Sequence, residues 1–116
     1  MKNEILSRLS ALPGRIAFYY QKLVTGARIA FHEEEPMMAA SVIKLFILAE
    51  AYRQMASGRL DKDRPVTIRR DKCVPSCGAL TYMHDGVQVT VEDLYTLMII
   101  LSDNSATNYL IEILGQ

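Results

Sequence analysis

Hydrophobic and polar residues follow two different periods in the first third of the chain. Apolar positions at near-helical spacing predict a short helix over residues 3–12, which ends at Pro13. Two β-prone runs, 15–21 and 27–32, come next, and the connection between them contains Gly26. Two such runs joined by a short glycine-containing connection predict a β-hairpin.

The pattern then turns helical and stays so for most of the remaining chain. One helix is expected from Ala40 to Ser57, with Gly58 just past its end. Residues 59–89 are irregular apart from the strand-like run VTIRR. Thr90, followed three positions later by an aspartate, indicates another helix start; polar SDNS interrupts that helix before ATNYLIEIL resumes it. A helix and a hairpin followed by helices indicate an α+β or α/β fold rather than a bundle.

Composition narrows the class of protein without deciding its function. The chain has 116 residues, of which 50% are hydrophobic and 22% are charged, as in an ordinary globular domain. The 13 basic residues balance the 13 acidic ones and form no cluster, so no nucleic-acid or membrane partner is expected. The charged N-terminus lacks a hydrophobic signal core. As written we expect a cytoplasmic protein, or a secreted or periplasmic one if a leader has been removed.

The cysteines and histidines do not indicate a cofactor. Cys73 and Cys77 lie in the loop-like stretch CVPSC, where two free thiols are favoured over a local disulfide in a cytoplasmic chain. His32 and His84 are far apart and lack metal-ligand spacing, so neither a metal site nor another cofactor is expected.

One lysine stands out in the apolar segment AASVIKLFILAEAY. Ser41 is a candidate N-cap or first residue of this helix, whereas Lys44 places a cation in the first turn, where the helix macrodipole disfavours it. The apolar residues around Lys44 predict a helix that is buried nearly all the way round. A buried ammonium is unfavourable unless it is paired, and burial favours the neutral amine, which can accept a proton.

The Ser41–Lys44 pair has two interpretations. Residues three apart share a helix face, so the Lys44 amine can take the proton of the Ser41 hydroxyl and activate it as a nucleophile. Alternatively, Ser41 only caps the helix, and Lys44 extends its stem along apolar surface to water.

A second polar island, residues 102–105, interrupts the apolar sequence LMIILSDNSATNYLIEIL. In one interpretation it only connects two helices, and Asp103 or Asn104 caps the second helix. In the other it is a cluster of hydroxyl, carboxylate and amide groups carried on the rigid ends of helices.

Together the two islands resemble the penicillin-recognising serine hydrolases, and most closely the class A serine β-lactamases. The S-x-x-K motif begins at Ser41, and S-D-N follows 61 residues later at Ser102. The hairpin with Gly26, Pro36 before the helix, CGALTYMHDG and VTVEDLYTLMIILSDNSATNYLIEILG also resemble the family's segments, in the same order. The resemblance covers essentially the whole chain and implies an α+β fold of the β-lactamase/transpeptidase type.

The resemblance also implies how the chain is organised. Residues 1–116 would be the N-terminal part of a single β-lactamase-like domain. Its helix and β-hairpin would lie in 1–36, and part of the helical subdomain, with both motifs, in 37–116.

Each motif residue acquires a role by this resemblance, in a reaction that forms an acyl-enzyme with a β-lactam. Ser41 would be the nucleophile, and its backbone N–H would form half of the oxyanion hole. Lys44 would be its proton acceptor or electrostatic partner, and Ser102 would relay a proton to the departing lactam nitrogen. Asn104 would bind the amide side chain of a β-lactam or peptide-like substrate. Asp103 would be structural, bonding backbone amides at the site.

Two parts of the family's machinery do not occur in this sequence: the deacylating glutamate of a later loop and the K-T-G strand. We therefore expect a β-lactamase-like serine hydrolase that is incomplete, with the remainder of its sheet missing, and weakly active or inactive alone. The open edge of the 15–21 strand would favour self-association or complementation by a C-terminal fragment.

Two alternatives stay open. A D,D-peptidase or esterase of the same superfamily also uses S-x-x-K with a serine/asparagine motif. A protein of a different class, a non-catalytic binding or assembly module, would keep the scaffold without turnover.

Overall fold

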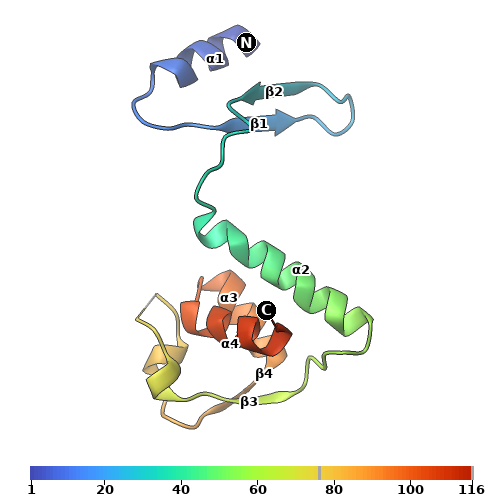
Figure 1. The fold of residues 1–116 in the computed structure, drawn as a ribbon, viewed down its shortest axis with the longest axis vertical. Coiled ribbons are helices and arrows are strands. Elements are labelled where there is room, and N and C mark those ends of the chain that lie inside the picture. The colour runs from blue at the N-terminus through green and yellow to red at the C-terminus, as the bar shows by residue number, and fades with distance from the viewer. Residues whose placement is uncertain (76, 116) are drawn as a thin grey trace. The chain divides into compact units, whose positions relative to one another are not determined.

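The computed structural model describes residues 1–75 and 77–115, which form four α-helices and four short strands (Figure 1). The helices are α1 (Lys2–Ala11), α2 (Ile43–Ala56), α3 (Val91–Ile100) and α4 (Asn104–Leu114). The strands are β1 (Phe18–Gln21), β2 (Arg28–Phe31), β3 (Pro65–Thr67) and β4 (Gln88–Thr90). The chain divides into two compact units, unit 1 (Met1–Met38) and unit 2 (Ala39–Gln116). Helices combined with small antiparallel sheets confirm the α+β class.

Unit 1 contains α1 and the hairpin of β1 and β2. The strands pair antiparallel, with Phe18 opposite Phe31, and Gly26 in the connection has a φ of +69°, a conformation that glycine adopts without steric cost. The predicted hairpin is therefore confirmed. The predicted strand 15–21 is too long, because His32 turns into the left-handed region with a φ of 47°. The second strand thus ends at Phe31, and residues 15–17 have no strand opposite them.

Unit 2 holds the hydrophobic core, where α2, α3 and α4 pack against one another. A short antiparallel ribbon places β3 beside β4, with Pro65 opposite Thr90. Thr90 then caps α3: its hydroxyl accepts from the Asp93 amide at 3.1 Å, and the Asp93 carboxylate accepts from the Thr90 amide at 2.8 Å. The helix start predicted from these two residues is confirmed. The buried apolar residues are Ala51, Leu60, Ile68, Leu80, Val91, Leu94, Met98, Ala106, Tyr109 and Leu110.

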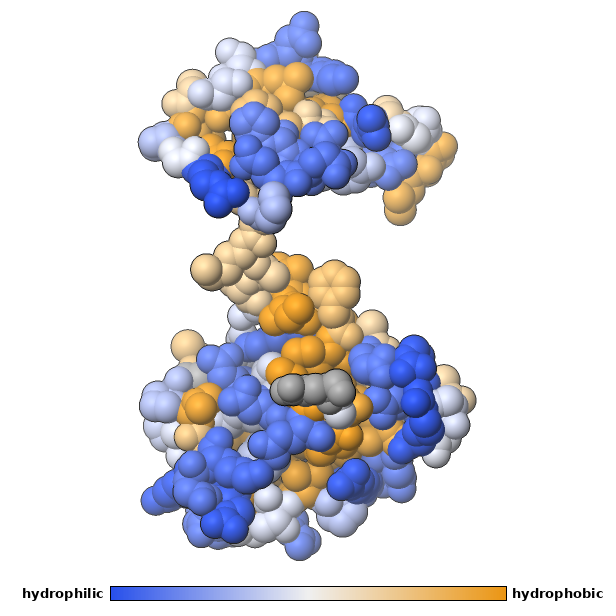
Figure 2. Space-filling view, viewed as in Figure 1, coloured by the Kyte–Doolittle hydropathy of each residue, from blue (hydrophilic) through white to orange (hydrophobic). Residues whose placement is uncertain are grey.

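Helix α2 lies where the sequence predicts it, but it is not buried all the way round. Only Lys44 and Ala51 of this helix are buried, whereas Leu45 and Phe46 are 58% and 68% exposed. Hydrophobic side chains are accordingly visible on the surface around the first turns of α2 (Figure 2). The prediction fails because, within the described residues, α3 and α4 pack on one face of α2 and leave the other open.

Candidate active site

Ser41 does not cap α2, contrary to one of the predictions. It lies in a 3₁₀ turn, η1 (Ala40–Val42), and the N-cap position of α2 belongs to Val42, which makes no side-chain cap bond. The carbonyls of Ala40 and Ser41 already accept from the Ile43 amide, so the turn satisfies the start of the helix with backbone groups. The Ser41 hydroxyl is instead 2.8 Å from the hydroxyl of Ser102, across 61 residues of sequence.

Lys44 turns its ammonium into the second polar island rather than toward solvent. The residue is only 5% exposed, and its Nζ donates to the Ser102 carbonyl at 2.6 Å, to Ser102 Oγ at 2.7 Å and to Asn104 Oδ1 at 2.9 Å. All three acceptors are neutral oxygens. The interpretation in which Lys44 reaches along apolar surface to water is therefore wrong.

Asp103 holds the second island in place. It is fully buried; one carboxylate oxygen caps α4 by accepting from the Ala106 amide at 3.0 Å, and the other accepts from the Leu80 amide at 3.0 Å. These bonds fix the start of α4 to the segment that precedes β4. The island therefore contains both features that were considered: a capped connection between α3 and α4, and a polar cluster that receives Lys44.

Gly78 lets Asp103 approach this segment closely. A β-carbon at position 78 would lie 2.0 Å from Asp103 Cγ, far inside van der Waals contact. Ser105, buried next to the cap, joins the same segment to α4, because its hydroxyl accepts from the Val74 amide at 3.0 Å and donates to the Val74 carbonyl at 3.3 Å. The loop bearing both cysteines, which are free thiols, is thus tied to the island.

The backbone is strained on both sides of the hydroxyl pair. Ala40, directly before Ser41, has a φ of 46°, and Ser102 has a φ of 54°. A residue other than glycine in this left-handed region costs on the order of 1–3 kcal/mol, and such outliers cluster at functional sites. No signal in the sequence marks these conformations, so Ala40 and Gly78 are the site residues that sequence reasoning missed.

A groove of about 360 Å³ opens beside the hydroxyl pair. Its walls are mainly hydrocarbon, and its polar atoms come from the two motifs. The lining residues are Ser41, Val42, Lys44, Leu45, Met98, Ile99 and Ser102. The structure thus brings Ser41, Lys44, Ser102 and Asn104 together, with Asp103 directly behind them, as the sequence motifs suggested.

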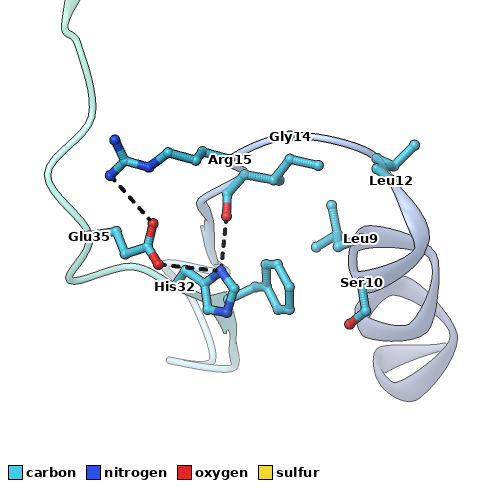
Figure 3. Close-up of a pocket in the computed structure, with 9 residues that line it drawn as sticks. Leu9, Ser10, Leu12, Gly14, Arg15, His32 and Glu35 are labelled. Carbon is cyan, nitrogen blue, oxygen red and sulfur yellow. Dashed lines mark hydrogen bonds and ion pairs between the residues drawn. The ribbon is translucent and has the colours of Figure 1, made fainter.

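Unit 1 has a separate pocket of about 180 Å³ between the end of α1 and the end of β2. Figure 3 shows the Glu35 carboxylate between Arg15, at 3.6 Å, and His32 Nδ1, at 3.8 Å. His32 Nδ1 also lies 3.2 Å from the Ile16 carbonyl, which can only accept, so this nitrogen carries a hydrogen. The charged groups of this pocket pair with one another on an exposed surface, and we assign it no chemistry.

Across residues 1–75 and 77–115, no three His, Cys, Asp or Glu side chains gather as metal ligands. In the same part of the chain, the helices are too short or too polar for any of them to cross a bilayer.

Known proteins are similar to this chain in sequence and in fold. The model of the beta-lactamase enzyme family matches residues 1–116. Beta-lactamase L2 of Stenotrophomonas maltophilia is 36% identical over 109 residues, which are 90% of this chain and 34% of that protein. The structure of PBP-A is similar at a TM-score of 0.91 and 31% identity, over 98% of this chain and 43% of that one. The structure of an ancestral class A β-lactamase is similar at a TM-score of 0.88 and 31% identity, over 99% of this chain and 44% of that one.

The architecture and its likeness to these structures define an α+β protein of the β-lactamase/transpeptidase type. The chain belongs to the beta-lactamase enzyme family, and the resemblance to its class A members is confirmed. It spans about a third of the length of its curated relative and less than half of the two solved structures.

Proposed function

We propose that this chain carries the acylation site of a β-lactamase-like serine hydrolase. Ser41 is the nucleophile that opens a β-lactam, Lys44 is the base and electrostatic partner, and Ser102 returns a proton to the departing lactam nitrogen. Asn104 binds the substrate's amide side chain, and Asp103 positions the island. The observation that carries the proposal is the contact of the Ser41 hydroxyl with Ser102 and, through it, with a buried ammonium.

A relative supports the acyl-enzyme chemistry. A mutant of PBP-A, 31% identical over 98% of this chain, has been solved as an acyl-enzyme complex with penicillin-G. For this chain the corresponding adduct is an ester on Ser41 Oγ, with the Ser41 amide as one oxyanion donor.

Deacylation should be much slower than acylation in residues 1–116 alone. Among the described residues, the carboxylate within the island, that of Asp103, already accepts from the Leu80 and Ala106 amides. Glu112, on the helix that follows, pairs with Lys72. Neither is available as a base to activate water for attack on the ester. We therefore expect a long-lived acyl-enzyme and slow nitrocefin turnover.

Fluorescent penicillin labelling followed by peptide mass spectrometry tests the proposal. One adduct on Ser41 is expected in the wild-type chain, with none in Ser41→Ala and an undiminished adduct in Ser7→Ala, which removes an exposed hydroxyl of α1. No adduct in a folded wild-type chain would reject the hydrolase and favour a non-catalytic binding module. Rapid hydrolysis of a D-Ala-D-Ala peptide or an ester, with poor β-lactam acylation, would favour the peptidase or esterase alternative.

We also propose that further polypeptide covers the exposed face of α2. The large exposures of Leu45 and Phe46 and the greater length of the relatives support this proposal. The partner can be a second copy of the chain or a complementing fragment, and the open hairpin edges offer it backbone donors and acceptors. Light scattering after size-exclusion chromatography tests it, because a well-folded monomer that does not bind the C-terminal portion of a relative would contradict it.

A further inference from the structure

The connection of the β1–β2 hairpin carries two large apolar side chains in open solvent. Leu23 and Val24 are 90% and 92% exposed, and hydrophobic surface is visible at the end of unit 1 where this connection lies (Figure 1, Figure 2). A turn needs a residue that adopts positive φ and favours polar side chains that bond the nearby backbone. Gly26 and Thr25 already meet these needs. The geometry of the turn therefore does not explain the two apolar residues.

Backbone hydrogen bonds hold this turn in one conformation. The Lys22 carbonyl accepts from the Gly26 amide at 2.8 Å and from the Thr25 amide at 3.2 Å. The Lys22 amide in turn donates to the Ala27 carbonyl at 2.8 Å. The two apolar side chains are thus presented on a preformed support, and a partner that contacts them has little backbone to order.

A cation stands on each side of the apolar pair. Lys22 precedes it and Arg28 follows it; both are exposed, and within residues 1–75 and 77–115 neither side chain has an ion pair or a hydrogen bond. The acidic run 33–35 follows β2 at the opposite end of the hairpin, and Glu4 on α1 pairs with Arg8. The charge balance of the whole chain therefore conceals two unpaired positive charges at this tip.

Two exposed tyrosines lie farther from the tip, on β1. Tyr19 and Tyr20 are 53% and 49% exposed. At ~3.3 Å per residue, three residues place Tyr20 roughly 10 Å behind Leu23. Along the hairpin the order is thus aliphatic, cationic, then tyrosine. A bilayer presents acyl chains, anionic headgroups and a hydrated interface, where tyrosine is enriched.

We propose that the hairpin tip, residues 22–28, is a contact site for an anionic membrane surface. Leu23 and Val24 enter the boundary of the acyl chains, and Lys22 and Arg28 pair with lipid phosphates. A lipid surface fits better than a protein, because a stable protein interface needs about 800 Å² from each partner, more than this narrow turn supplies. The contact is weak and reversible, and it uses no residue of the candidate active site.

A single tryptophan placed at the tip tests the proposal directly, because the sequence contains none. The variant is Leu23→Trp, and Phe46→Trp on the exposed face of α2 is the matched control. We mix each with vesicles of phosphatidylglycerol and phosphatidylcholine, or of phosphatidylcholine alone. With anionic vesicles, emission at position 23 should shift to the blue and be quenched by brominated acyl chains. Position 46 should show neither change, and phosphatidylcholine alone should give little binding.

Cosedimentation with the same vesicles measures which side chains carry the contact. Leu23→Ser combined with Val24→Ser should lower the partition coefficient at least about 10-fold, because the apolar side chains are lost. Lys22→Gln should lower it about 5-fold, and added salt should weaken binding of the wild type. Leu12→Ser, which changes another exposed leucine of unit 1, should have no effect. Circular dichroism checks that every variant is folded.

Three outcomes overturn the membrane contact. The first is an unchanged emission at position 23, or an equal shift at position 46, which would indicate adhesion through the open face of α2. The second is equal cosedimentation of the wild type and the double serine variant. The third is a dimer in light scattering that the double serine variant abolishes, which would assign the tip to a second copy of the chain. None of these measurements involves acylation of Ser41, so failure here leaves the proposed function intact.

Discussion

Unit 1 and unit 2 bury their apolar side chains to very different extents. None of the described residues of unit 1 is buried, and its residues Leu23 and Val24 are 90% and 92% exposed. Unit 2 contains every buried apolar residue of the described chain, together with buried Lys44 and Asp103. Burial of apolar area is the main favourable term in folding. Unit 2 therefore holds the stability, and the candidate site lies entirely on it.

The same contrast recurs inside unit 2, between the two faces of α2. One face presents Lys44 to the polar island, and the other exposes Leu45 and Phe46. A charged side chain is thus buried, while its apolar neighbours in the sequence are exposed to solvent. Helix α2 therefore contributes both to the site, through Lys44, and to the core, through Ala51.

The largest expected effect is on the free energy of unfolding, and it should differ between the two units when one leucine is truncated in each. Leu94→Ala, at a fully buried position of α3, should lower the free energy of unfolding by about 3 kcal/mol because it removes packed methyl groups and leaves a cavity. Leu9→Ala, at a half-buried position of α1, should change it by less than about 1 kcal/mol. Urea unfolding followed by circular dichroism measures both. Equal losses would contradict the assignment of stability to unit 2.

A somewhat smaller effect is expected from the anchor of the polar island. Asp103→Ala leaves the Leu80 and Ala106 amides without their carboxylate and should cost about 2 kcal/mol. It should also slow acylation of Ser41, because Ser102 loses its support. Thermal unfolding and penicillin labelling measure the two effects. The control is Asp63→Ala, which removes an exposed carboxylate paired with Lys62 and should alter neither appreciably.

The capping box of α3 provides a third test. Thr90→Ala should cost about 1 kcal/mol, because the Asp93 amide loses its hydroxyl acceptor at the start of the helix. Thr90→Ser keeps the hydroxyl and should recover most of this loss. If the two variants unfold at the same urea concentration, the cap does not stabilise unit 2.

The smallest effect is a dependence of stability on alkaline pH. Burial in unit 2, assisted by the Glu92 carboxylate, raises the pKa of Tyr95 to about 12. A tyrosine in the unfolded chain titrates near pH ~10. The folded state therefore keeps this proton more tightly, and its contribution is full below pH ~10 and is lost as pH rises toward 12. Urea unfolding at pH 9, 10 and 11 should show a shallower decline in Tyr95→Phe than in the wild type; equal declines would refute the assignment.

Periodicity predicted most of the fold, and the two motifs marked side chains that the structure brings together. The helix at α2, the hairpin and the Thr90 cap follow from local patterns, and local patterns are what a sequence displays directly. The exposure of Leu45 and Phe46 could not be predicted, because an apolar pattern marks which side chains avoid water and not how many elements are present to cover them.

The geometry inside the site could not be predicted from the sequence either. Spacing places Ser41 and Lys44 on one helix face, but it does not show that the first lies in a 3₁₀ turn or that its hydroxyl turns toward Ser102. The left-handed conformations of Ala40 and Ser102 depend on the packed chain around them. A motif cannot indicate the direction in which each donor points, because the packed chain around the motif sets that direction.

The missing side chain at Gly78 sets a limit on how this protein can change over generations. Every missense change of that codon adds at least a β-carbon where Asp103 already lies. In a survey of replacements scored by the yield of folded protein, position 78 should therefore tolerate replacement poorly, although it contributes no reactive atom. Intolerance to replacement at this position would then reflect the lack of space beside Asp103 and not a part in the reaction.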